Sequence, residues 1–138
     1  MIATHARLAS GFVSAIELLI SCSKDIEVID AYIDGTDITD RICRFISSIQ
    51  PDDTGIIFTD LKCGSVNQRV LNLMPAEAKN IFVITGVNLP LILEVVLTDT
   101  VIDTGYLNEV IEMARKELAL LELSALRREF QEDSFDFS

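Results

Sequence analysis

Two short segments that are apolar at nearly every position constrain the fold more than any other feature of the sequence. They are residues 55–60 (GIIFTD) and residues 80–85 (NIFVIT). A strand with consecutive apolar residues is covered on both faces, which is typical of a parallel sheet between two layers of helices. Residues 1–4 and the β-branched run at 26–33 predict two further strands.

Segments with helical periodicity separate these predicted strands. Apolar side chains recur with a period near 3.6 in residues 8–21, 38–49 and 66–74, and Pro90 suits the first turn of a further helix. This alternation predicts an α/β fold: a three-layer αβα sandwich whose central sheet is mainly parallel, doubly wound and built of about four or five strands.

The C-terminal quarter of the chain has a different character. Residues 98–105 are polar and are predicted to form a loop, whereas residues 106–128 contain neither Gly nor Pro and predict one long amphipathic helix. Residues 129–138 are acidic with interleaved Phe. We therefore expect one domain in residues 1–128 and a loosely ordered tail in residues 129–138.

The charge of the chain disfavours several kinds of partner. The formal net charge is −11 at pH 7, so the protein repels nucleic-acid backbones and anionic lipid surfaces and attracts basic partners. No apolar run is long enough to span a membrane, and the N-terminus does not resemble a signal peptide. The three cysteines, Cys22, Cys43 and Cys63, form neither a disulfide framework nor a zinc motif, so we expect a cytoplasmic protein.

In a doubly wound sheet, ligands bind at the carboxyl ends of the strands. His5, the only histidine of the chain, follows the first predicted strand next to Thr4, and Asp60 ends the third. These two residues are the candidate catalytic pair, because an imidazole is nucleophilic at neutral pH and a carboxylate can fix its tautomer. Such a site needs no metal and no cofactor if donor and acceptor are both phosphohistidines.

Six residues besides His5 and Asp60 lie at the same predicted edge. The backbone amides of Gly64 and Ser65, at the start of a predicted helix, can bind phosphate oxygens. Thr4, Cys63, Gly86 and Asn88 are expected to complete the rim of the site.

Each of these residues also has a purely structural interpretation. A lone histidine near the start of a chain is usually incidental, and an Asp at the end of a strand commonly forms a turn or caps a helix. Gly-Ser before a helix is a common cap, and Cys63 suits a small gap. The functional interpretation gains support because all these residues fall on one predicted edge.

Three segments together resemble the IIA component of the mannose class of the bacterial phosphoenolpyruvate-dependent sugar phosphotransferase system (PTS). IATHARLASG resembles the family's strand that ends in Ser/Thr-His-Gly and continues into a helix. IIFTDLKCGSVNQ resembles its strand followed by Asp and a Gly-Gly-Ser turn, and VITGVNLPLILE resembles its Gly-Val-Asn-Ile/Leu-Pro segment.

The resemblance implies a phosphocarrier. His5 would accept a phosphoryl group from the phosphocarrier protein HPr and pass it to a histidine of a IIB domain, while Asp60 orients the ring. Gly64 and Ser65 would line the phosphate site, and Asn88 would shape its rim. IIC and IID subunits would provide the contact with the membrane, and the chain would form a homodimer.

The chain departs from the family pattern at several positions. Ala6 stands where the family usually has Gly, and its Cβ is expected to restrict the turn after His5. Cys63 replaces the first Gly of the Gly-Gly-Ser turn, and Val66 replaces a common Pro. Family members usually end in a strand exchanged between two subunits, whereas residues 119–128 are predicted here to continue the helix.

Two alternatives remain open at this stage. The phosphohistidine subunit of a dihydroxyacetone-kinase-type system shares the fold and the chemistry but has a different acceptor. The departures at Ala6 and Cys63 suggest the second alternative, a regulatory module with a modified site. A nucleotide-binding enzyme is disfavoured, because the chain has neither GxGxxG nor GxxxxGK[ST].

Overall fold

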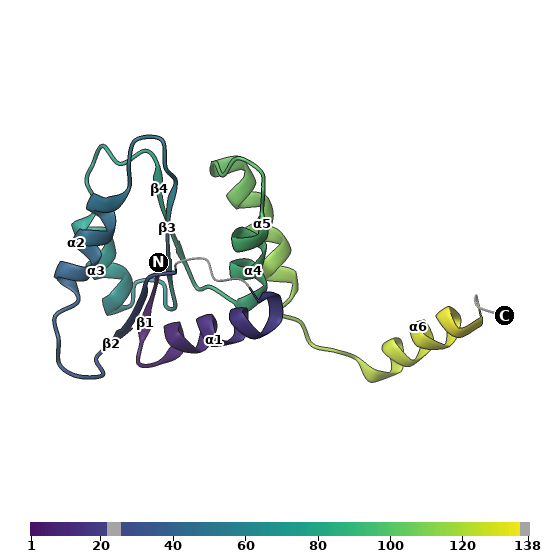
Figure 1. The fold of residues 1–138 in the computed structure, drawn as a ribbon. Coiled ribbons are helices and arrows are strands. Elements are labelled where there is room, and N and C mark those ends of the chain that lie inside the picture. The colour runs from purple at the N-terminus through teal and green to yellow at the C-terminus, as the bar shows by residue number, and fades with distance from the viewer. Residues whose placement is uncertain (22–25, 136–138) are drawn as a thin grey trace.

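The computed structural model describes residues 1–21 and 26–135, and the predicted strand at 26–33 is shorter in it than expected. The central sheet contains four strands in the order β2-β1-β3-β4, and all of its pairings are parallel (Figure 1). The elements in chain order are β1 (Ile2–His5), α1 (Leu8–Ile20), β2 (Val28–Ala31), α2 (Thr39–Ser48), β3 (Gly55–Thr59), α3 (Ser65–Leu73), β4 (Ile81–Thr85), α4 (Leu89–Leu97), α5 (Thr104–Lys116) and α6 (Leu123–Phe135).

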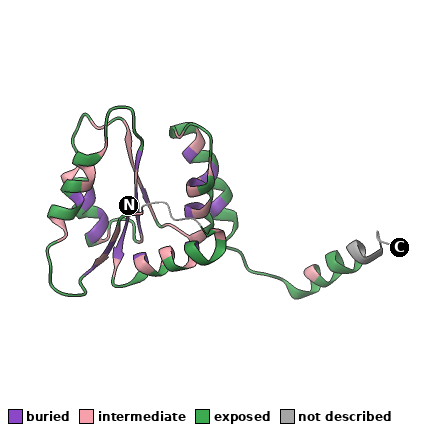
Figure 2. Cartoon of the chain, viewed as in Figure 1, coloured by how far each residue is buried: buried purple, intermediate pink, exposed green. Residues whose placement is uncertain are grey.

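Helices cover both faces of the sheet, which confirms the predicted αβα sandwich. Figure 1 shows α2 and α3 on one side of the strands and α1, α4 and α5 on the other. Successive residues of a strand pack on opposite faces of the sheet. Ile57 packs in the hydrophobic cluster beneath α2 and α3, and Phe58 packs in the cluster beneath α1, α4 and α5. This division explains why the strands are apolar at consecutive positions. Buried residues accordingly line the inner side of each layer (Figure 2).

The strand order creates a switch point between β1 and β3. The chain leaves β1 through α1 to reach β2 on one side, and then crosses through α2 to β3 on the other side of β1. β1 and β3 pair directly, with Ile2 beside Phe58 and Ala3 beside Thr59. The helices that follow these two strands lie on opposite faces, so their carboxyl ends border the crevice in which doubly wound sheets bind ligands.

The prediction of one long helix over residues 106–128 was wrong. α5 ends at Lys116, and α6 begins only at Leu123. The leucines between them have no surface of their own domain to cover: Leu118 is 89% exposed and Leu120 is 91% exposed. An amphipathic helix gains most of its stability from burying its apolar face, so periodicity alone did not maintain the helix here. Figure 1 shows α6 projecting away from the body of the fold.

The acidic segment predicted as a tail, residues 129–138, begins inside α6, and its last three residues lie outside the described part of the chain. Over the described residues, no helix is both long and apolar enough to cross a membrane.

The turns at the carboxyl edge of the sheet hold residues in the left-handed region. Ala6 (φ 49°), Tyr32 (φ 66°) and Cys63 (φ 61°) come shortly after β1, β2 and β3, whereas Ser21 (φ 46°) ends α1. The left-handed conformation costs residues with a Cβ about 1–2 kcal/mol each. The turn after His5 therefore forms even though Ala6 has a Cβ. Three of the four strained residues, Ala6, Tyr32 and Cys63, lie at the edge of the sheet that carries the candidate site.

Replacing these residues by glycine should raise the free energy of unfolding. We expect an increase of about 1 kcal/mol for Ala6→Gly and for Ser21→Gly, since glycine adopts positive φ without strain. Chemical denaturation measures the difference. Ser14 is exposed inside α1, and Ser14→Gly should instead lower the free energy of unfolding by about 0.5 kcal/mol. A loss of stability in Ala6→Gly equal to that in Ser14→Gly would contradict this account.

Candidate functional site

His5 and Asp60 meet at the switch point between β1 and β3. The Nδ1 atom of His5 lies 2.9 Å from Oδ2 and 3.1 Å from Oδ1 of Asp60. The backbone N–H of His5 also donates to Oδ2 of Asp60 at 2.9 Å. One carboxylate therefore holds both the backbone and the ring of the last residue of β1, and the contact predicted from the strand ends exists.

The environment of Asp60 keeps it ionised. Burial raises the pKa of Asp60, but hydrogen bonds from the backbone and ring of His5, the charge of His5 and the Leu61 N–H together outweigh burial, so the pKa lies below 3.8. An ionised carboxylate only accepts hydrogen bonds, so Nδ1 of His5 carries the proton. The lone pair of the neutral ring is then on Nε2.

A chain of hydroxyl groups leads to Nε2 from the opposite side. The Oγ atom of Ser65 lies 3.1 Å from Nε2 of His5 and accepts a hydrogen bond from the hydroxyl of Tyr32 at 2.7 Å. The ring of Tyr32 stands beside the imidazole, with 5.6 Å between the ring centroids. Ser65 therefore lies where it was predicted, and Tyr32 is an additional member of the site.

Gly64 lacks a side chain, and this leaves space for the ring of His5 and for Leu61. A Cβ at this position would lie 3.3 Å from Cε1 of His5 and 3.0 Å from Cβ of Leu61. The amide of Gly64 donates to the carbonyl of Leu61 at 3.0 Å. The predicted phosphate-binding amide of Gly64 is thus already engaged in the turn. Ser65 is the first residue of α3, whose N-terminus carries a partial positive charge.

A buried side chain fixes the turn that carries Cys63. Asn67 is 4% exposed, donates through Nδ2 to Oγ1 of Thr59, and accepts through Oδ1 from the Cys63 N–H. The turn before α3 is therefore tied to the end of β3. The cysteine itself has an exposed side chain and forms no disulfide.

The remaining predicted rim residues support the site from a distance. Thr4 is fully buried and its Oγ1 accepts from the Ala9 N–H at 2.7 Å, which caps the start of α1. Asn88 caps α4 through Leu91 and donates to the carbonyl of Ala114 on α5. No described hydrogen bond joins Thr4, Asn88 or the positive-φ Gly86 to the ring of His5.

Sequence reasoning missed Tyr32 and Asn67. Tyr32 follows β2 directly and so lies at the same edge of the sheet as His5, the last residue of β1; its place at a strand end was the available signal. Asn67 lies in a stripe with Val66 and Val70 that faces the core. A polar residue on an apolar stripe is the usual sign of a buried hydrogen bond.

The arrangement suits nucleophilic chemistry at one nitrogen. His5 has a side chain that is 34% exposed, whereas that of Asp60 is only 10% exposed, so the ring can be approached while its orienting partner stays covered. Among the side chains that the structure describes, in residues 1–21 and 26–131, no cluster of three or more His, Cys, Asp or Glu residues could hold a metal ion.

Comparison with known proteins identifies the family. The model of the family described as PTS system fructose IIA component matches residues 1–114. A search of curated proteins finds no match.

Three solved structures share the fold. One is a Klebsiella pneumoniae protein provisionally described as a phosphoenolpyruvate-dependent sugar PTS permease, with 24% identity, 90% of each chain covered and a TM-score of 0.77. A second is the PTS IIA protein associated with the fucose utilization operon of Streptococcus pneumoniae, with 23% identity, 91% of this chain and 92% of that chain covered and a TM-score of 0.69. The third is a mannose/sorbose-specific IIA subunit from Enterococcus faecalis, with 14% identity, 88% of this chain and 92% of that chain covered and a TM-score of 0.74.

The lowered pKa of Asp60 predicts an acid-sensitive contribution to stability. As the pH falls, the unfolded chain takes up this proton near pH 3.8, before the folded chain does. The contribution is therefore complete above about pH 5 and is lost as the pH falls through 3.8 and below. Denaturation at a series of pH values should show a shallower acid loss of stability in Asp60→Asn than in the wild type. Equal pH dependence in the two proteins would contradict the assignment.

Proposed function

Since the chain belongs to the family of PTS system fructose IIA components, we propose that it is a phosphocarrier that uses His5. It accepts a phosphoryl group from phosphorylated HPr and transfers it to a IIB domain during sugar uptake. The observation that carries the proposal is the pairing of Nδ1 with Asp60, 2.9 Å apart, which leaves Nε2 as the nucleophilic atom.

The transfer step follows from this geometry. The lone pair on Nε2 of His5 attacks the phosphorus atom, the nitrogen–phosphorus bond of the donor breaks, and the donor imidazole keeps the electron pair. Nδ1 keeps its proton and its hydrogen bonds to Asp60, so the positive charge that develops on the ring is stabilised by a carboxylate that is already in place. The reverse sequence passes the phosphoryl group to the acceptor.

The oxygens of the transferred group have donors close to Nε2. The hydroxyl of Ser65 lies 3.1 Å from that atom, and α3 begins at the same residue. A helix N-terminus of this kind stabilises a phosphate group through its free amides and its dipole. The positive charge on the ring and the negative phosphoryl group would thus each meet a group of opposite sign.

The surroundings of the site are consistent with protein partners. Arg7 and Lys62 are exposed and flank His5 and Asp60 along the chain, although the chain as a whole carries a net charge of −11. The exposed Leu8 and Leu61 lie in the same two connections and offer apolar contact. We infer that HPr and IIB bind here in the cytoplasm and that any contact with the membrane is made through IIC and IID subunits.

A homodimer is part of the proposal. Leu118, Leu120 and Leu121 are exposed, and they belong to a segment that leads away from the body of the fold to α6. Light scattering of the purified chain should give twice the 15.3 kDa of one chain. Changing these three leucines to Ser should give the monomer, whereas Val101→Ser, also at an exposed residue, should not. A monomeric wild type would contradict this part of the proposal.

Phosphorylation can be followed without ambiguity, because the chain contains one histidine. With phosphoenolpyruvate, enzyme I and HPr, the wild type should acquire one acid-labile phosphoryl group, and His5→Ala should acquire none. Asp60→Asn should be phosphorylated at least about 100-fold more slowly, because the ring loses its charged partner.

The matched control is Asp30→Asn. In the wild type the Asp30 carboxylate accepts hydrogen bonds from Ser10 rather than from His5. This variant should be phosphorylated at close to the wild-type rate. The absence of labelling in the wild type, or undiminished labelling of His5→Ala, would refute the proposed function.

A further inference from the structure

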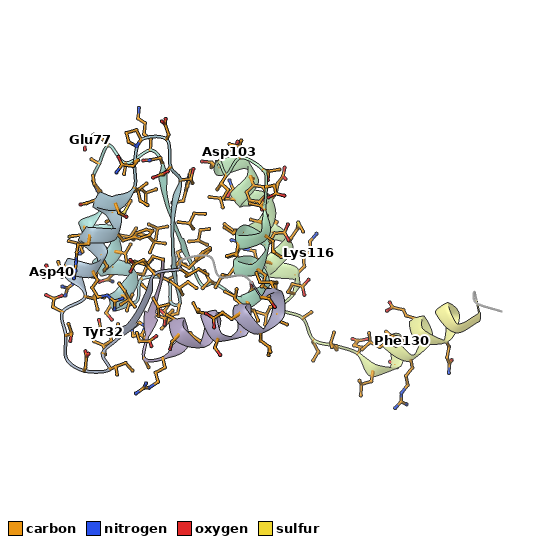
Figure 3. The ribbon with its side chains drawn as sticks, in the orientation of Figure 1. Tyr32, Asp40, Glu77, Asp103, Lys116 and Phe130 are labelled. Carbon is orange, nitrogen blue, oxygen red and sulfur yellow. The ribbon has the colours of Figure 1, made fainter. Side chains whose placement is uncertain are left out.

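Tyr32 contacts the site but was not among the site residues predicted from the sequence, and it takes no part in the transfer step described above. It follows β2 at the carboxyl edge of the sheet, where Figure 3 labels it. Its hydroxyl donates to Oγ of Ser65 at 2.7 Å, and its ring stands 5.6 Å from that of His5 at an interplanar angle of 38°. One side chain therefore touches both the nucleophile and the hydroxyl group next to it.

The conformation of Tyr32 indicates that stability is not the reason for its presence. Its φ is 66°, in the left-handed region where bulky residues are rare, and the residue is 63% exposed. Glycine or asparagine would occupy this backbone at lower cost. Backbone strain of this kind is concentrated at functional sites, where the position of the side chain outweighs its energetic cost.

We propose that Tyr32 is a positioning residue that directs the hydroxyl proton of Ser65 toward Nε2 of His5 and, after transfer, toward the phosphoryl group carried there. This inference rests on the proposed function and adds a residue to it. In the free protein, the Tyr32 hydroxyl donates to one lone pair of Ser65 Oγ. The single proton of Ser65 is then left to face Nε2, 3.1 Å away.

Phosphorylation changes what Ser65 can bind. A phosphoryl group on Nε2 occupies the lone pair that accepted the Ser65 proton, so this proton turns to a phosphoryl oxygen. The Tyr32 hydroxyl keeps Ser65 in place as a donor. The ring of Tyr32 lies within the distance of about 6 Å at which an aromatic face attracts a cation, so it also favours the positively charged phosphoimidazole.

The expected consequence is a longer lifetime of phosphohistidine. Loss of the group to water passes through a loose transition state that resembles metaphosphate, in which the phosphoryl oxygens carry less charge than before. A hydroxyl that binds these oxygens stabilises the phosphorylated state more than the transition state. Removing the Tyr32 hydroxyl should therefore shorten the lifetime about fivefold, the size expected for one neutral hydrogen bond.

The test uses the full chain and needs no partner protein. Phosphoramidate phosphorylates the histidine chemically: its nitrogen–phosphorus bond breaks, the bond from Nε2 to phosphorus forms, and ammonia leaves. Phosphorus-31 NMR then follows hydrolysis in the wild type, Tyr32→Phe, Ser65→Ala and the double variant. The control is Tyr106→Phe, since Tyr106 is the only other tyrosine and its hydroxyl faces the carbonyl of Glu94.

The two single variants should each lose phosphate about fivefold faster, and the double variant should be no faster than Ser65→Ala, because Tyr32 acts through Ser65. Tyr106→Phe should match the wild type. A wild-type lifetime in Tyr32→Phe, or effects of the two changes that multiply, would overturn the proposal.

Folding and function can be separated in the same series. Tyr32→Gly removes the strained side chain, so its melting temperature should equal or exceed that of the wild type while its phosphohistidine is lost faster; a normal lifetime in this variant would also overturn the proposal. Failure of phosphorylated HPr to label the chain would refute the proposed function alone, since the lifetimes are measured on chemically phosphorylated protein.

Discussion

The carboxylate of Asp60 accepts hydrogen bonds from both the backbone and the ring of His5, and the rest of the site depends on this pairing. It joins the ends of β1 and β3. These strands are separated in sequence by β2 but lie side by side in the sheet, because the chain crosses over between β2 and β3. The pairing also fixes the ring tautomer, so that Nε2 faces Ser65 and the start of α3. Position, tautomer and charge compensation thus come from one side chain that is only 10% exposed.

Much of this arrangement could be predicted from the sequence, because it depends on local patterns. Consecutive apolar residues in 55–60 and 80–85 can only be buried between two helical layers, and this requirement specified the sandwich. Once the strands were placed, the carboxyl ends of the first and third had to lie at one edge. The contact between His5 and Asp60 followed from topology without knowledge of any side-chain geometry.

Other features depend on tertiary contacts that no local pattern records. The helix predicted through residue 128 stops at Lys116, because the leucines beyond it have no surface of their own domain to cover. Gly64 was predicted to offer its amide to phosphate, but that amide donates to the carbonyl of Leu61 within the turn. What the site needs from Gly64 is the absence of a Cβ, which leaves space for the ring of His5. The role of Tyr32 required a left-handed backbone, which sequence patterns do not predict for tyrosine.

The central claim is that Asp60 holds the proton of His5 on Nδ1 and leaves Nε2 as the nucleophile. Nitrogen-15 NMR of the histidine-labelled chain tests it most directly, because a single histidine gives a single pair of ring signals. With the ring neutral, the account predicts a protonated Nδ1 and an unprotonated Nε2 in the wild type, and a loss of this preference in Asp60→Asn. A proton on Nε2 in the wild type, or no change in Asp60→Asn, would contradict it.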